Sequence, residues 1–211
     1  MKILILTGGD LDPVFACSYI KTWEPDKVIA ADRGLLQAEK LDLRPDAILG
    51  DFDSCSREVI ERFETKDKTL APCEKDDTDT GLAVQKALAM GADEILILGA
   101  TGTRLDHVLG NIGQLVYAFQ NGAKAQIVDG HNRISVLEHH HRIAKEQQFG
   151  RYISLIPLYE AQGVTLSGFK YPLNEDTLVF HESWGISNEL IETYGEIRFR
   201  SGTLLMIESR D

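Results

Sequence analysis

Two carboxylates one residue apart carry the clearest chemical signal in the sequence. Asp51 and Asp53 lie in the stretch ILGDFDS, residues 48–54, directly after a short apolar run. Two negative charges this close repel each other and raise each other's pKa, so we expect a compensating positive charge nearby. Mg²⁺ prefers oxygen ligands and usually binds one or two carboxylates together with substrate phosphates. We therefore expect Asp51, Asp53 and the later Asp79 to surround Mg²⁺.

Segments rich in glycine and charged residues follow the other apolar runs. They are TGGD (7–10), DRG (32–34), KDDTD (75–79) and GATGTRLDH (99–107). Glycines let backbone N–H groups approach phosphate oxygens, and Arg104 is suited to clamp a transferring phosphate. A metal, backbone donors, positive charge and a positioning carboxylate are the parts that phosphoryl transfer needs.

Simpler structural roles also explain some of these residues. Asp76 or Asp77 can cap a helix that starts there, and Asp106 in a first helical turn can complement the helix dipole. Taken singly, each of these acids is better explained by its structural role. Asp51 and Asp53 follow a strand and cap nothing obvious, which favours the metal site.

The elements that must position these residues alternate between strand and helix patterns. Continuous apolar runs predict strands at 3–6, 28–31, 47–49, 69–71, 95–98 and 126–128. Capping signals and helical spacing predict helices from Asp12-Pro13 to about Trp23, at Ser56–Thr65, at Thr78–Met90 and from Arg104 onward. Apolar runs without alternation are typical of strands covered on both faces. We therefore expect an α/β fold with a doubly wound, mostly parallel sheet, whose ligands bind at the carboxyl ends of the strands.

The remainder of the chain has a different pattern. From about residue 131 the helical period fades, and short, partly alternating segments with Gly and Pro punctuation favour antiparallel strands in a sandwich or small barrel. The change falls near Asp129-Gly130. We predict an α/β nucleotide-binding catalytic domain over residues 1–130 and an antiparallel β-sandwich domain over residues 131–211.

Composition narrows the function classes. The 211-residue chain has a net charge of −11, which disfavours nucleic-acid binding because phosphate backbones repel an acidic protein. No apolar run is long enough to cross a membrane, and the odd number of widely spaced cysteines suggests no disulfide framework. A cytoplasmic location follows. The run His139–His141 has polar and charged neighbours, which favours an exposed loop over a metal site.

The motifs together resemble thiamine pyrophosphokinase. GDFDS (50–54), KDDTD (75–79), GATGTRLDH (99–107) followed by Asn111, and GISNE (185–189) occur in the family's order and rough spacing. The resemblance implies transfer of a diphosphoryl group from Mg-ATP to the hydroxyl of thiamine, with release of AMP. It also implies a homodimer in which the subunits share the thiamine site.

The resemblance assigns roles by position in the catalytic motifs. Asp51, Asp53 and Asp79 match the family's Mg²⁺ and catalytic carboxylates, and Arg104 and Asp106 match its Arg-x-Asp pair. Either Asp79 or Asp106 would orient the thiamine hydroxyl and accept its proton. The residues expected to contact ATP are Asp32, Lys75, Asp76, Thr101, Gly102 and Arg104.

The thiamine site would lie around GISNE. Ser187 and Asn188 match the family's thiamine-binding turn. Trp184 either stacks on thiamine or packs within the β-domain, and Glu189 could balance the thiazolium charge.

Two positions depart from the family pattern. Arg33 replaces a glycine in the bacterial Ala-Asp-Gly-Gly segment, and Thr103 replaces a glycine in GATGGR.

Two other functions fit parts of the pattern. A haloacid-dehalogenase-like phosphatase also uses Asp-x-Asp after a strand, but it expects Thr or Val where Cys55 stands. A nucleotide-sensing module would explain the glycines but neither GISNE nor the excess of carboxylates. A phosphatase would release inorganic phosphate, and a sensor would release nothing.

Overall fold

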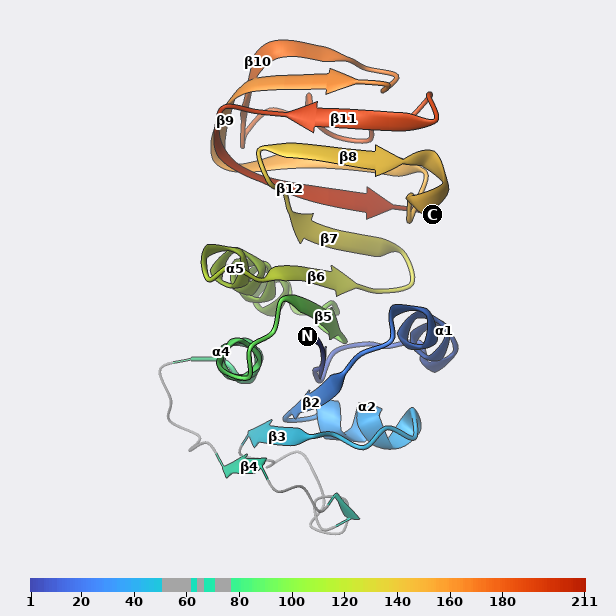
Figure 1. Cartoon of the computed structure of the whole chain (residues 1–211), viewed down its shortest axis with the longest axis vertical. Coiled ribbons are helices and arrows are strands. Elements are labelled where there is room, and N and C mark those ends of the chain that lie inside the picture. Colours follow the sequence, from blue (N-terminus) through green and yellow to red (C-terminus); the bar gives the residue numbers. More distant parts are fainter. Residues whose placement is uncertain (51–61, 64–66, 71–76) are drawn as a thin grey trace. The chain divides into compact units, whose positions relative to one another are not determined.

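The computed structural model describes residues 1–50, 62–63, 67–70 and 77–211 (Figure 1). The chain divides into two compact units, Met1–Gly130 and His131–Asp211. In the part of the chain that the structure describes, no helix combines the length and apolar character needed to cross a bilayer.

The first unit is built on a parallel sheet with the strand order β4–β3–β2–β1–β5–β6. The strands are β1 (Lys2–Leu6), β2 (Lys27–Ala31), β3 (Ala47–Gly50), β4 (Asp67–Leu70), β5 (Glu94–Leu98) and β6 (Lys124–Val128). Strand β1 lies between β2 and β5, so the chain changes winding direction there. Open parallel sheets bind ligands at such a switch point.

Helices cover the two faces of this sheet. They are α1 (Pro13–Trp23), α2 (Gly34–Lys40), α4 (Asp79–Ala89) and α5 (Leu105–Gln120). Figure 1 shows α1 and α2 on one side of the strands and α4 and α5 on the other, where α4 packs against α5. Because both faces are covered, Ile3 to Leu6 in β1 are completely buried. The non-alternating strand pattern read from the sequence is thereby explained.

Local capping starts two of the first-unit helices, α1 and α4, where the sequence predicts. The Asp12 carboxylate accepts hydrogen bonds from the backbone N–H groups of Val14 (2.9 Å) and Phe15 (3.4 Å) at the start of α1. The Thr78 hydroxyl accepts one from the N–H of Gly81 (3.1 Å) at the start of α4. These side chains satisfy donors that the first helical turn leaves without an intrahelical partner.

One helix was missed, and another prediction is not tested. Helix α2 has only 7 residues, which is too short for helical periodicity to be evident. A Cβ on Gly34 would lie 2.0 Å from the carbonyl oxygen of Leu6, so α2 begins in direct contact with β1. Most of the helix expected at Ser56–Thr65 lies outside the described residues.

The second unit consists of antiparallel strands in the order β7–β12–β9–β11–β8, with β10 paired to β9. The strands are β7 (Asn132–Val136), β8 (His140–Ala144), β9 (Tyr152–Ser167), β10 (Leu173–Val179), β11 (Tyr194–Arg198) and β12 (Ser201–Ser209). A cluster of buried apolar residues, most of them in these strands, forms its core. The predicted combination of parallel and antiparallel sheet is confirmed.

Two details of the second unit differ from the sequence prediction. Where the sequence predicts only short strands, residues 152–167 form the single long strand β9, in which Gly163 accommodates a φ of +66°. The prediction of a loop at His139–His141 is wrong for His140 and His141, which pair with β11 as part of β8. Its polar composition suggested a loop because β8 is an edge strand, in which His140 and Arg142 are exposed.

Candidate active site

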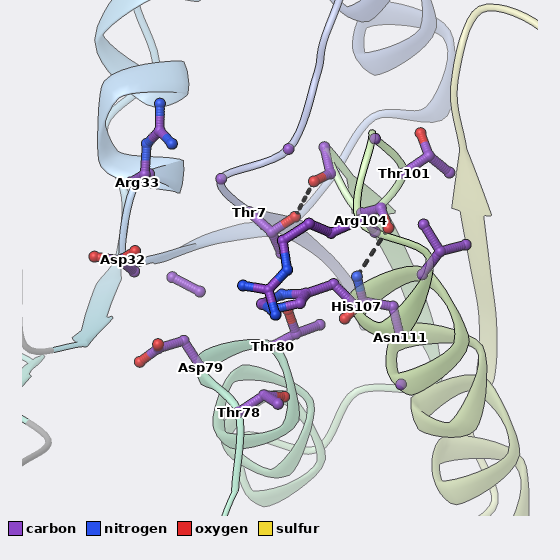
Figure 2. A pocket seen from close by; sticks show the side chains of 18 of the residues that line it. Thr7, Asp32, Arg33, Thr78, Asp79, Thr80, Thr101, Arg104, His107 and Asn111 are labelled. Atoms are coloured by element: carbon purple, nitrogen blue, oxygen red, sulfur yellow. Dashed lines mark hydrogen bonds between the residues drawn. The ribbon is translucent and has the colours of Figure 1, made fainter. Parts of the chain in front are cut away.

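A cavity of about 670 Å³ opens at the carboxyl ends of β1, β2 and β5. The loops that follow these strands line it, together with the first turns of α4 and α5. In the view of Figure 2, Asp32 and Arg33 lie on one side of the cavity, and Arg104, His107 and Asn111 lie on the other. The cavity is therefore at the switch point of the sheet, where the sequence predicts the ligand site.

The loop after β1 is locked against the loop after β5. The Thr7 hydroxyl donates to the carbonyl oxygen of Gly99 (2.5 Å), and the N–H of Gly9 donates to the same oxygen (2.7 Å). A Cβ on Gly9 would lie 2.3 Å from that oxygen and 2.4 Å from the carbonyl oxygen of Thr101. Only glycine permits this approach, and it brings two backbone loops into one cavity wall.

Several residues predicted from scattered motifs meet around this cavity. Those that line it are Asp32, Asp79, Thr101, Gly102, Arg104 and Asp106. The other predicted residues of the first unit, Asp51, Asp53, Lys75 and Asp76, lie outside the described residues. Within the described part, no group of three or more His, Cys, Asp or Glu side chains is arranged to hold a metal ion.

A sharp backbone turn positions Asp32. Its φ is +46°, and its N–H donates to the carbonyl oxygen of Leu49 in the neighbouring strand β3 (2.7 Å). Gly50, with a φ of +138°, passes so close that a Cβ there would lie 3.0 Å from the Cα of Asp32. The β3 end thus supports the turn that carries the Asp32 carboxylate to the cavity.

Asp79 is the first residue of helix α4 and is half-buried. Its neighbours stabilise the helix start: Thr78 caps it, and Asp77 accepts from the N–H of Thr78 (2.8 Å) and from the Gln85 amide (2.7 Å). The sequence suggested Asp76 or Asp77 as the cap of this helix. The N-cap is instead Thr78, and Asp77 contacts the start of the helix. Asp79 is left facing the cavity at the positive end of the helix dipole.

Arg104 and Asp106 form a bidentate ion pair beside the cavity. Nε of Arg104 donates to Oδ1 of Asp106 (3.2 Å), and Nη2 donates to Oδ2 (2.6 Å). Hydrogen bonding from the guanidinium holds the pKa of Asp106 below its ordinary value, and the same bond raises the pKa of Arg104. Asp106 therefore stays ionised and fixes the direction of the Arg104 guanidinium.

Asn111 supports the cavity wall, although its place in a motif gave no role for its side chain. It is buried, and its Nδ2 donates to the carbonyl oxygen of Ala100 (2.8 Å). His107 and Asn111 are four positions apart in α5, so they lie on one face of the helix, and Arg104 directly precedes its first turn. That spacing is the signal that could have identified Asn111 as an anchor for the loop.

The turn predicted to bind thiamine belongs to the second unit. Asn188 is 4% exposed, and its amide accepts from the N–H of Tyr171 (3.0 Å) and donates to the carbonyl of Tyr171 (2.7 Å). Ser187 is exposed and has a φ of +55°. Trp184 is 65% exposed, so the packed position considered for it is wrong, while stacking on thiamine stays a prediction.

Glu189 is already paired with two cations. Its carboxylate accepts from Nζ of Lys170 (2.8 Å) and from Nε of Arg151 (2.9 Å). These bonds, that from Lys170 first, lower the pKa of Glu189. Its charge is therefore compensated within the second unit.

Family models match most of both units in order. Residues 19–127 match the catalytic domain of thiamin pyrophosphokinase, and residues 140–204 match the vitamin B1 binding domain of thiamin pyrophosphokinase. The chain belongs to the thiamine pyrophosphokinase family. Membership makes it a transferase of the kinase type, and the family resemblance drawn from the motifs is confirmed.

Individual relatives agree with this assignment. Thiamine pyrophosphokinase from Bacillus subtilis is 37% identical over 186 residues, which is 87% of each chain. The crystal structure of thiamine pyrophosphokinase from Bacillus subtilis superposes with a TM-score of 0.86 at 32% identity, and the match covers 100% of both chains. That of thiamin pyrophosphokinase from Geobacillus thermodenitrificans gives 0.84 at 33% identity, covering 100% of this chain and 98% of the other.

The Asn111 bond should contribute to stability. We expect Asn111→Ala to lower the free energy of unfolding by about 1–3 kcal/mol, because the buried Ala100 carbonyl loses its donor. Asn121→Ala is the matched control: its amide makes the same kind of bond to the carbonyl of Tyr117 (2.8 Å), but at the exposed end of α5. Urea unfolding measures both. Equal losses in the two variants would contradict a special role for Asn111.

The Arg104–Asp106 pair should be visible in the titration of Asp106. Because the pKa of Asp106 is lowered, the ion pair is present at neutral pH and is lost only as pH falls through that lowered pKa. We expect Arg104→Gln to move the pKa of Asp106 upward, toward the ordinary aspartate value. Carboxyl-detected NMR of the two proteins measures the change, and an unmoved titration curve would refute the pairing in solution.

Proposed function

We propose that this chain transfers the diphosphoryl group of Mg-ATP to the hydroxyl of thiamine, giving thiamine diphosphate and AMP. The observation that carries the proposal is the joint match of a thiamin pyrophosphokinase catalytic domain and a vitamin B1 binding domain, in that order, along one chain. The cavity at the sheet switch point supports it, because two glycine-rich loops and two arginines line that cavity.

Mg²⁺ is the cation that we assign to the site, with Asp51, Asp53 and Asp79 as its ligands. Of these, Asp79 lies among the described residues, and its carboxylate lines the cavity together with that of Asp32. These oxygen donors fit a hard cation. When bound, Mg²⁺ would neutralise negative charge on the phosphates.

The nucleotide would occupy the cavity of the first unit. The cavity-lining residues proposed to contact ATP are Asp32, Thr101, Gly102 and Arg104. Lys75 and Asp76 complete the proposed set from outside the described residues. Arg104 presents a guanidinium whose direction is fixed by Asp106, and a fixed fork of donors is well suited to phosphate oxygens.

The transfer itself is a displacement at phosphorus. The hydroxyl oxygen of thiamine attacks the β-phosphorus of ATP, the bond from that phosphorus to the oxygen bridging to the α-phosphorus breaks, and AMP leaves with that oxygen. The hydroxyl proton passes to a carboxylate, either Asp79 or Asp106. An alcohol is a weak nucleophile, so holding it in line with the leaving group supplies much of the rate enhancement.

Thiamine would be bound with the help of the second unit, which we propose to be a β-sandwich domain that also forms the homodimer. Trp184 offers an exposed ring to the cationic thiazolium or the pyrimidine. Asn188 ties the turn to Tyr171, which holds the exposed Ser187 in place. We further infer a homodimer with a shared thiamine site and a cytoplasmic location.

The reaction is tested with purified protein, ATP, Mg²⁺ and thiamine, separating the products by chromatography. We expect AMP and thiamine diphosphate in equal amounts, and none of either after the metal is chelated. Release of inorganic phosphate instead would indicate a phosphatase. Nucleotide binding without any product from folded protein would indicate a sensor, and either result would overturn the proposal.

The thiamine role of Trp184 predicts a selective kinetic defect. We expect Trp184→Ala to raise the KM for thiamine roughly 3- to 30-fold, the range of a partly desolvated cation–π contact, while the KM for ATP changes little. Tyr159→Ala removes another exposed ring of the second unit and is the control. An unchanged thiamine KM in Trp184→Ala would show that the ring does not contact the substrate.

A further inference from the structure

Arg33 is a cationic residue of the cavity to which the family resemblance gives no role, because the bacterial pattern has glycine there. It follows strand β2 and immediately precedes helix α2. Its side chain is exposed and lines the cavity. Figure 2 shows it on the side of the cavity away from Arg104.

The stem of Arg33 is held by the loop after β1. A Cβ on Gly8 would lie 2.8 Å from Cβ of Arg33 and 3.6 Å from both its Cγ and its Cδ. The aliphatic part of the side chain therefore runs over Gly8, in the loop that forms one wall of the cavity. Only the guanidinium extends beyond this contact.

The charge around the cavity is unfavourable for a polyanion. The described lining has two arginines, Arg33 and Arg104, against four carboxylates: those of Asp10, Asp32, Asp79 and Asp106. With His107 neutral, these groups carry a net charge of −2. A triphosphate entering the cavity is repelled unless cations compensate.

The two arginines differ in their availability. Arg104 is engaged by both carboxylate oxygens of Asp106. Arg33, by contrast, makes no ion pair with any residue that the structure describes. Arg33 is thus the guanidinium that can meet an incoming phosphate without first giving up a described partner.

We propose that Arg33 binds the phosphate chain of the nucleotide, from the side of the cavity opposite to Arg104. That the nucleotide is ATP rests on the proposed function. A guanidinium binds phosphate oxygens through paired N–H donors, which lysine cannot reproduce. The contribution of Arg33 to the binding affinity should increase with the number of phosphates on the ligand and be absent for a nucleoside.

The test measures binding of ATP, ADP, AMP and adenosine to the full chain by calorimetry, at fixed Mg²⁺ and ionic strength. Arg33→Gln keeps most of the stem over Gly8 and removes the charge. We expect it to weaken ATP binding about 10- to 150-fold, as for a hydrogen bond to a charged group. The loss shrinks through ADP and AMP and vanishes for adenosine.

Two further variants make the result specific. Arg33→Lys retains the charge but not the fork, so it should recover only part of the ATP affinity. Lys40→Gln removes one positive charge from the end of α2, away from the cavity lining, and should bind all four ligands as the unmodified protein does. Far-UV circular dichroism confirms that each variant is folded.

Several outcomes would overturn the proposal. An equal loss for all four ligands would place Arg33 on the base or ribose, and no loss for ATP would leave it without a ligand role. Binding does not require turnover, so the two proposals can fail separately. If Arg33→Gln loses affinity in proportion to the number of phosphates but the unmodified protein forms no thiamine diphosphate, the role of Arg33 stands and the proposed reaction is overturned. If the unmodified protein forms thiamine diphosphate but Arg33→Gln binds ATP normally, the reaction stands and the role of Arg33 is overturned.

Discussion

The backbone contact between the loops after β1 and β5 is the constraint on which the candidate site depends. Gly99 offers one carbonyl oxygen to both the Thr7 hydroxyl and the Gly9 N–H, at a separation that excludes any Cβ on Gly9. Parallel strands bring these loops to the same edge of the sheet. Asn111 then ties the β5 loop to helix α5, so the cavity wall is preformed and binding need not order it.

Charge is the second constraint on the cavity. Its described lining carries more carboxylates than guanidinium groups, which suits cation binding but opposes a polyphosphate. Asp106 neutralises the charge of Arg104 and fixes the direction of its guanidinium. Arg104 therefore adds little net positive charge to attract a phosphate. A metal held by Asp79 and its predicted partners, together with Arg33, would restore the balance that ATP requires.

The sequence predicts much of this arrangement because the relevant signals are local. Asp12-Pro13 and Thr78 start their helices through short-range caps, and continuous apolar runs indicate strands buried on both faces. Helix α2 was not predicted because its 7 residues are too few for a periodic signal, and β8 was not predicted because an edge strand can be polar. The Asn111 bond and the Gly8–Arg33 contact are tertiary, so composition and spacing cannot specify them.

A crystal structure of this protein with Mg²⁺ and an ATP analogue carrying a methylene group between the α- and β-phosphorus tests the account most directly. The account predicts phosphates at the carboxyl ends of β1 and β5, contacted by the backbone of residues 7–10 and 99–104. A nucleotide bound elsewhere on a folded protein, with this cavity empty, would contradict the assignment of the switch point as the site of phosphate binding.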